Sequence, residues 1–132
     1  MRTELSKKSK YHMERNRYLE LKYFCLQYPI WKKAHESLTS LSKKGDILAK
    51  ISDIPDPTAR CAEAREFYAE RMKLIEDCCA LAAPNCCKWL LKGVTEGLSY
   101  DILAAREVLP VSRAEYYDKY RMFFWIMNSE RR

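Results

Sequence analysis

Apolar side chains recur every three or four residues along most of this 132-residue chain, which contains only three glycines. That spacing places apolar residues on one side of an α-helix, whereas a half-buried strand requires strict alternation. Hydrophobic residues make up 48% of the chain, which is enough to bury a core. The sequence therefore predicts an all-α fold.

Prolines and glycines divide the chain into about six expected helices. Pro29 suits the first turn of a helix and disfavours helix at the residue before it. Gly45 follows two lysines, a common way for a helix to end, and Asp56-Pro57 is typical of a helix start. The expected helices cover residues 11–28, 29–44, 57–83, 86–96, 100–108 and 113–128.

These helices predict two regions within one compact unit. Residues 1–84 would form a helical hairpin followed by a long central helix. Residues 85–132 would form a trihelical helix-turn-helix on which the first region packs. The last two helices meet at Leu109-Pro110, with Ser99 expected to cap the first of them. Ser112 and Glu115 form the S-x-x-E pattern of a capping box at the start of the second.

A helical wheel of residues 113–128 separates an aromatic side from a more polar one. The predicted core side carries Tyr116, Tyr117, Tyr120, Phe123, Phe124 and Met127. In DNA-binding helix-turn-helix proteins, early residues of the second helix meet base edges in the major groove. The predicted DNA contacts are therefore Ser112, Arg113, Ala114, Glu115, Asp118, Lys119 and Arg121. Many helical proteins that never touch DNA share such a corner, so a helix-turn-helix without a DNA-binding role remains the alternative. Met122 and Trp125 on the polar side are expected to pack on the N-terminal helices or on a second subunit.

The net charge of +6 is concentrated at the two ends of the chain. Residues 1–22 carry seven Lys and Arg against three Glu, and residues 113–132 carry five basic against three acidic residues. An excess of positive charge favours a polyanionic partner. The predicted phosphate contacts near the N-terminus are Lys7, Lys8, Lys10, Arg15 and Arg17.

Six cysteines raise the question of a zinc site, but their spacing argues against one. Adjacent residues in the pairs 78–79 and 86–87 point about 100° apart on a helix, so they do not converge on one centre. Free thiols acting as small apolar residues are expected instead. No phosphate-binding loop or Cys–His pairing indicates catalysis, so neither an enzyme nor a cofactor or metal is expected. The chain shows no membrane span and no secretory signal, which predicts a cytoplasmic protein.

Two stretches, "KYFCLQYPIWKK" and "LLKGVTEGLSYDILAAREVLPVSRAEYYDKYRMFFWIM", resemble a family of small helix-turn-helix proteins from Firmicutes prophages and integrative elements. The second stretch is also similar to sigma factor region four and to phage late-gene regulators of the ArpU and RinA type. The residues that match the family pattern are Ser112, Arg113, Tyr116, Tyr117, Tyr120 and Arg121. Val111, Ala114 and Met122 depart from it, and Met122 replaces a basic residue. The resemblance implies a phage-derived transcriptional regulator whose recognition helix begins near Arg113.

Two functional hypotheses follow. The first is a nucleoid-associated regulator, monomeric or homodimeric, that binds double-stranded DNA through the C-terminal helix-turn-helix. The alternative is a protein-binding module of a mobile element: an antirepressor, an adaptor to RNA polymerase, or an inhibitor of a host defence nuclease such as an anti-CRISPR. Three tryptophans and nine tyrosines would supply the anchors of such an interface.

Overall fold

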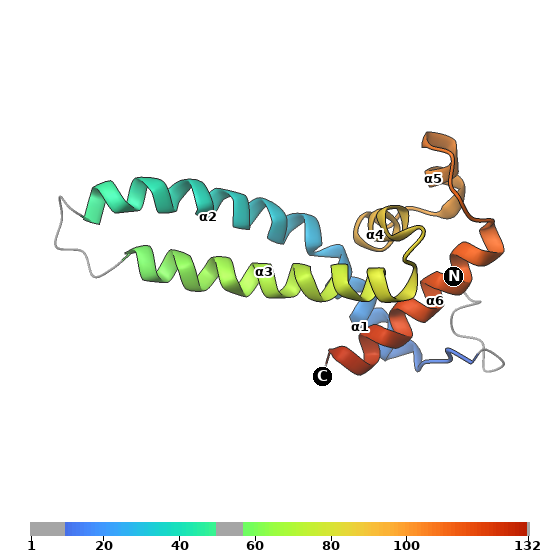
Figure 1. The fold of residues 1–132 in the computed structure, drawn as a ribbon. Helices are drawn as coiled ribbons and strands as arrows, with labels where there is room; N and C mark the ends of the chain where they lie inside the picture. The colour runs from blue at the N-terminus through green and yellow to red at the C-terminus, as the bar shows by residue number, and fades with distance from the viewer. Residues whose placement is uncertain (1–9, 50–56, 132) are drawn as a thin grey trace. The chain divides into compact units, whose positions relative to one another are not determined.

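The structure is a computed structural model that describes the backbone of residues 10–49 and 57–131 and the side chains of residues 10–40 and 59–131. Within those ranges every regular element is a helix, so the predicted all-α fold is confirmed (Figure 1). The helices are α1 (Arg15–Leu26), α2 (Tyr28–Ala49), α3 (Pro57–Ala82), α4 (Cys87–Glu96), α5 (Tyr100–Arg106) and α6 (Arg113–Glu130).

These helices form two compact units. One unit comprises Met1–Gln27 and Leu74–Arg132, and the other comprises Tyr28–Lys73. The second unit consists of α2 and the first part of α3, which run antiparallel in Figure 1. This grouping differs from the expected regions 1–84 and 85–132, because α1 and the last turns of α3 belong with the C-terminal helices.

The core of the first unit is built where α1 packs against both α4 and α6. Helices α4, α5 and α6 also pack against one another, which gives the three-helix arrangement expected for the C-terminal region. Helices α1, α3, α4 and α6 each contribute a fully buried side chain, and Leu103 of α5 is 2% exposed. Burying one such large apolar side chain contributes about 1.5–3 kcal/mol. The fully buried large side chains include Leu21, Ile75, Leu90, Tyr116 and Phe123.

The aromatic side of α6 faces this core as the helical wheel predicts. Five of the six residues assigned to it are buried, and Tyr120 is half-buried. The Phe124 ring lies 4.9 Å from that of Tyr120 and 5.1 Å from that of Tyr18 in α1. Edge-to-face and tilted contacts of this kind add to the stabilisation from burial.

The cysteines are free thiols, as expected. Cys25, Cys78, Cys79 and Cys86 are buried in the core of the first unit, and Cys61 and Cys87 are half-buried. Burial raises the pKa of the Cys78 thiol to about 11 and also raises those of Cys25 and Cys79. Among the described residues no three Cys, His, Asp or Glu side chains are placed to hold a metal ion.

Several helix boundaries follow the predicted punctuation. α1 ends just before Tyr28-Pro29, and α4 ends at Gly97, whose φ of 69° lies in the left-handed region that favours glycine. The expected end of the second helix at Gly45 is wrong, because α2 continues to Ala49. A single glycine within a helix costs only about 1 kcal/mol, which the flanking helix-compatible residues tolerate. Asp56, the expected cap of α3, lies outside the described residues.

None of the described helices combines the length and the apolar character needed to cross a membrane.

Candidate nucleic-acid interface

The corner between α5 and α6 is held by Tyr100, the first residue of α5. Its hydroxyl donates to the Val111 carbonyl over 2.9 Å, at the end of the connection. Its backbone N–H donates to the Tyr117 hydroxyl over 3.1 Å, which links the start of α5 to α6. One residue therefore fixes both the connection and the helix that follows it.

The connection itself is longer than the sequence predicts. α5 ends at Arg106 rather than at residue 108, which leaves six residues, 107–112, between the two helices. Glu107 has an extended backbone, with φ −144° and ψ 157°, and Pro110 disfavours helix at Leu109. A turn of three or four residues is usual in helix-turn-helix proteins, so this corner is more open than most.

Glu107 also ties the connection to α4. Its carboxylate accepts a hydrogen bond from the Trp89 indole over 2.8 Å and lies 3.4 Å from the Lys92 ammonium and 3.6 Å from that of Lys88. The Trp89 bond and the two lysines lower the pKa of Glu107. Sequence reasoning missed this cluster. Lys88 and Lys92 are four residues apart on one helix face, but nothing local indicates a partner fifteen or more residues away.

Ser112 caps α6 as predicted. Its Oγ accepts from the Glu115 N–H over 3.2 Å, and its extended backbone is typical of a cap residue. The expected capping box is only half formed. Within the described part of the chain, the Glu115 carboxylate makes no return bond to Ser112, so it remains exposed at the start of the helix.

The predicted DNA-contacting residues differ in their accessibility. Those in and before the first turn of α6 are exposed: Ser112, Arg113, Ala114 and Glu115. Asp118 and Lys119 are half-buried, and the side chain of Arg121 is only 21% exposed. Among the predicted DNA contacts, accessibility therefore falls from the first turn of α6 to Arg121.

Weak ion pairs occupy the two arginines of this set. An Arg113 nitrogen lies 3.8 Å from an Asp101 oxygen in α5, and both side chains are more than 60% exposed. An Arg121 nitrogen lies 3.9 Å from an Asp118 oxygen, one turn earlier in α6. Exposed pairs of this kind contribute little stability, about 0–1 kcal/mol, so a ligand that offers better acceptors displaces them easily.

Three of the five predicted N-terminal phosphate contacts, Lys10, Arg15 and Arg17, lie among the described residues. Lys7 and Lys8 lie outside the described residues. Lys10 and Arg15 are exposed, and the Lys10 ammonium lies 4.9 Å from the centre of the Tyr11 ring. Arg17 points into the protein, so phosphate contact by Arg17 is the part of the prediction that this geometry favours least.

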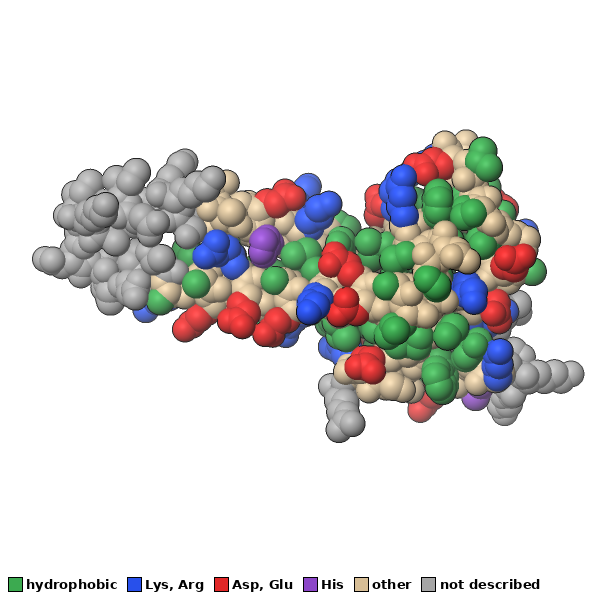
Figure 2. Space-filling view, viewed as in Figure 1, with side chains coloured by type: hydrophobic (Ala, Val, Ile, Leu, Met, Phe, Trp, Pro, Cys, Tyr) green, Lys and Arg blue, Asp and Glu red, His purple; other side chains and the backbone are tan. Residues whose placement is uncertain are grey.

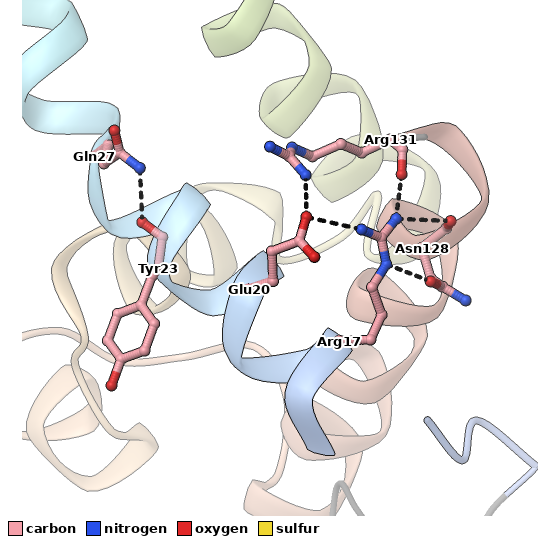
Figure 3. Close-up of polar contacts among 6 residues, drawn as sticks. All are labelled: Arg17, Glu20, Tyr23, Gln27, Asn128 and Arg131. Carbon is pink, nitrogen blue, oxygen red and sulfur yellow. Dashed lines mark hydrogen bonds and ion pairs between the residues drawn. The ribbon is translucent and has the colours of Figure 1, made fainter. Parts of the chain in front are cut away.

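Arg17 connects α1 to the end of α6 (Figure 3). Its Nε donates to Asn128 Oδ1 over 2.7 Å, and its Nη2 donates to the main-chain carbonyls of Asn128 and Arg131. Glu20 accepts from both Arg17 and Arg131, and its pKa is lowered, chiefly by the Arg131 bond. A cation near the last carbonyls of a helix opposes the negative end of its dipole.

Trp125 lies on the polar side of α6 and packs against the segment before α1. Its ring centre is 5.9 Å from that of Tyr11, and 46% of the residue is exposed. The sequence predicts that Trp125 packs on the N-terminal helices or on a second subunit, and its ring contact is with Tyr11, which precedes α1.

The exposed surface around the corner carries charges of both signs and several apolar side chains. Asp101, Arg106, Arg113 and Glu115 are all exposed there. Val108 is 93% exposed and Ile102 44% exposed. Figure 2 shows hydrophobic, acidic and basic side chains next to one another over the region of α5. Because this surface is not uniformly basic, non-specific attraction to a polyanion would be weak, and any nucleic-acid binding would depend on particular contacts.

Comparisons with protein-family models, with curated proteins and with solved structures find no match to this chain.

Proposed function

We propose that this chain is a DNA-binding transcriptional regulator, derived from a phage or mobile element, that reads double-stranded DNA with the first turns of α6. One observation carries the proposal. The tip of α6, from Ser112 to Glu115, is exposed and capped, and Tyr100 holds it at a fixed angle to α5. The phage origin rests on the sequence resemblance described above.

The side chains at this tip suit recognition of base edges. Arg113 supplies the fork of donors that binds guanine O6 and N7, and the carboxylates of Glu115 and Asp118 accept from the cytosine amino group. The exposed Asp101 pair holds Arg113 in the free protein and yields to a guanine at little cost. Phosphate contacts come from Lys119, Arg121, Lys10 and Arg15, with Lys7 and Lys8 before them in the sequence.

Selection from a library of random DNA duplexes at physiological salt tests this proposal. We expect enrichment of a short motif that contains guanine and cytosine, with affinity that falls as salt rises. The matched control is the Arg113→Ala variant, which should enrich a motif with one position relaxed. Recovery of no motif, with equal affinity for all duplexes, would reject the reader role.

A second candidate function is protein binding, and the exposed apolar side chains around α5 favour it. Val108, in the connection, is almost completely exposed, and Ile102, in α5, is nearly half exposed. Large exposed apolar groups rimmed by charges are typical of protein interfaces. In this reading the helix-turn-helix is a scaffold for an antirepressor, an RNA polymerase adaptor or an inhibitor of a host nuclease.

A pull-down from nuclease-treated host lysate separates the two functions. A partner that is retained by the wild type and by Arg113→Ala, but lost with Val108→Asp, would favour protein binding. A partner that disappears when DNA is removed would favour the reader. Leu81→Asp, a change at another exposed apolar residue outside this corner, is the matched control for added charge.

A further inference from the structure

A cavity of about 140 Å³ lies within the first unit, between α1, the turn from α4 to α5, and α6. Lys22 and Tyr18 line it from α1, Gly97 and Ser99 from the turn, and Tyr117 and Tyr120 from α6. The volume is close to that of a cavity that admits a benzene-sized molecule. A ligand of a few non-hydrogen atoms therefore fits.

The cavity exists because Gly97 reverses the chain. Its left-handed backbone lets the N–H groups of Gly97 and Leu98 both bond to the Gly93 carbonyl, which turns the chain towards α1. A Cβ at Gly97 would lie 3.5 Å from Leu26 of α1, so the two segments approach closely here. The turn thereby places Ser99 beside residues of α1 and α6.

Two hydroxyls at the cavity accept a hydrogen bond through their oxygen but donate none to another described residue. The Tyr117 oxygen accepts from the Tyr100 N–H, and the Ser99 oxygen accepts from the Ile102 N–H over 3.3 Å. Neither hydroxyl proton has an acceptor among the described residues. Tyr117 lines the cavity, and the residue as a whole is only 8% exposed.

Lys22 adds a positive charge to these donors. Its side chain is half-buried, and no carboxylate in the described part of the chain pairs with it. Other lysines of this unit, such as Lys88 and Lys92, are paired with Glu107. The hydroxyls of Tyr18 and Tyr120, which also line the cavity, form a hydrogen bond of 2.8 Å with each other.

We propose that this cavity binds a small oxyanion, the carboxylate or phosphate group of a small molecule, through Lys22, Tyr117 and Ser99. An ammonium and two hydroxyl donors that lack acceptors are complementary to an anion, which accepts only. The site is separate from the tip of α6, so it does not depend on whether the chain binds DNA. It links α1, the start of α5 and α6, and its occupant would stiffen the corner described above.

Titration of the full-length protein with inorganic phosphate and, separately, with acetate tests the site. Each anion is compared with chloride at equal ionic strength, and binding is followed by backbone amide NMR. We expect the largest shifts at Gly97, Leu98 and Ser99, and an increase in melting temperature that follows the occupancy. Shifts located at other places, or an equal response to chloride, would overturn the proposal.

The Lys22→Met variant keeps the aliphatic stem and removes the charge. We expect this variant to bind the anion about tenfold more weakly, or weaker still, because a charge-assisted hydrogen bond is lost. Lys32→Met, at an exposed lysine of α2, makes the same change in net charge and should bind as the wild type does. Lys22→Arg should retain binding. Equal affinities for the Lys22→Met and wild-type proteins would overturn the assignment.

The source of the anion is distinguished by a third measurement. If neither free anion binds, and Lys22→Met weakens binding to random duplex DNA more than Lys32→Met does, the cavity holds a DNA phosphate and the small-molecule site is rejected. If a free anion binds and the two variants bind duplex equally, the small-molecule site is supported.

Discussion

Trp89 of α4 donates its indole N–H to the Glu107 carboxylate over 2.8 Å, and this bond attaches the connection between α5 and α6 to the helix before them. Lys88 and Lys92 lie on either side of Trp89 and direct two positive charges at the same carboxylate. The position of the corner is therefore set by a polar cluster as well as by the aromatic core beneath α6.

The Glu107 cluster makes stability depend on pH. Because the folded-state pKa of Glu107 is lowered, its contribution is present above the unfolded pKa and is lost as the pH falls through the folded value. We expect Glu107→Gln to lower the melting temperature at about pH 7 and to match the wild type at about pH 3. Thermal unfolding monitored by circular dichroism measures both. Glu96→Gln, at an exposed carboxylate, should change neither; a pH-independent loss in Glu107→Gln would contradict the prediction.

Arg113 is the residue on which base recognition most depends in the proposed reader. Arg113→Ala should reduce affinity for a selected site by about 1–3 kcal/mol and leave affinity for random duplex almost unchanged. Arg15→Ala should instead weaken both alike and reduce the salt dependence by about one phosphate contact. Fluorescence anisotropy over a range of salt concentrations separates the two. Equal losses on selected and random duplex for Arg113→Ala would remove it from the base-reading role.

The sequence predicts the parts of this fold that depend on local chemistry. The helix period, the Ser99 and Ser112 caps and the end of α4 at residue 96 each depend on a few neighbouring residues, and the structure contains all of them. The helical wheel of residues 113–128 likewise predicts which side of α6 is buried. The end of α2 was missed because one glycine is only weakly unfavourable in a helix.

Long-range relationships could not be read in the same way. Nothing near Arg17 indicates that it binds the end of α6, more than a hundred residues later, so its charge was assigned to phosphate contact. The anion-sized cavity depends on where α1 meets the turn at Gly97, and no local pattern encodes that meeting. Of the candidate interface, sequence identified the exposed tip but not the decline in exposure towards Arg121.

Arg17 and Arg15 allow stability to be separated from phosphate binding. Arg17→Met should reduce the free energy of unfolding by about 1–3 kcal/mol, because it leaves Asn128 and the final carbonyls of α6 without their donor. Arg15→Met, two residues away and exposed, should leave stability within about 0.5 kcal/mol of the wild type. Urea denaturation measures the difference. Similar stabilities for the two variants would show that the contacts of Arg17 contribute nothing in solution.

The burial of the cysteines predicts two classes of thiol. Cys61 and Cys87 are half-buried and should react with an aromatic disulfide reagent under native conditions. Cys25, Cys78, Cys79 and Cys86 should react only as the protein opens, because the core blocks access to them. Burial raises the pKa of these four thiols and also that of Cys87, so Cys87 should react more slowly than Cys61. Mass spectrometry of the labelled peptides assigns the sites. Rapid native labelling of Cys25 or Cys79 would contradict the packing of this core.

Tyr116 of α6 approaches Gly93 of α4 closely in the core of the first unit. The Tyr116 side chain is fully buried, and its hydroxyl has no hydrogen-bond partner within the described residues. A Cβ at Gly93 would overlap that hydroxyl. The Tyr116 hydroxyl therefore fits only because residue 93 is a glycine. A buried hydroxyl without a partner costs about 1–3 kcal/mol, and a phenyl ring keeps the same apolar packing.

Tyr116→Phe should therefore be neutral or stabilising, by up to about 2 kcal/mol, in urea denaturation. Gly93→Ala should be strongly destabilising in the wild type and much less so in the Tyr116→Phe background, since the overlapping atom is gone. The interaction free energy from this double-mutant cycle should exceed about 0.5 kcal/mol, as expected of residues in direct contact. Tyr117→Phe provides the control for loss of a hydroxyl, because the Tyr117 oxygen accepts from Tyr100 and its removal should destabilise the corner. If Tyr116→Phe costs as much as Tyr117→Phe, the Tyr116 hydroxyl has a partner in solution, such as an ordered water, and the prediction is wrong.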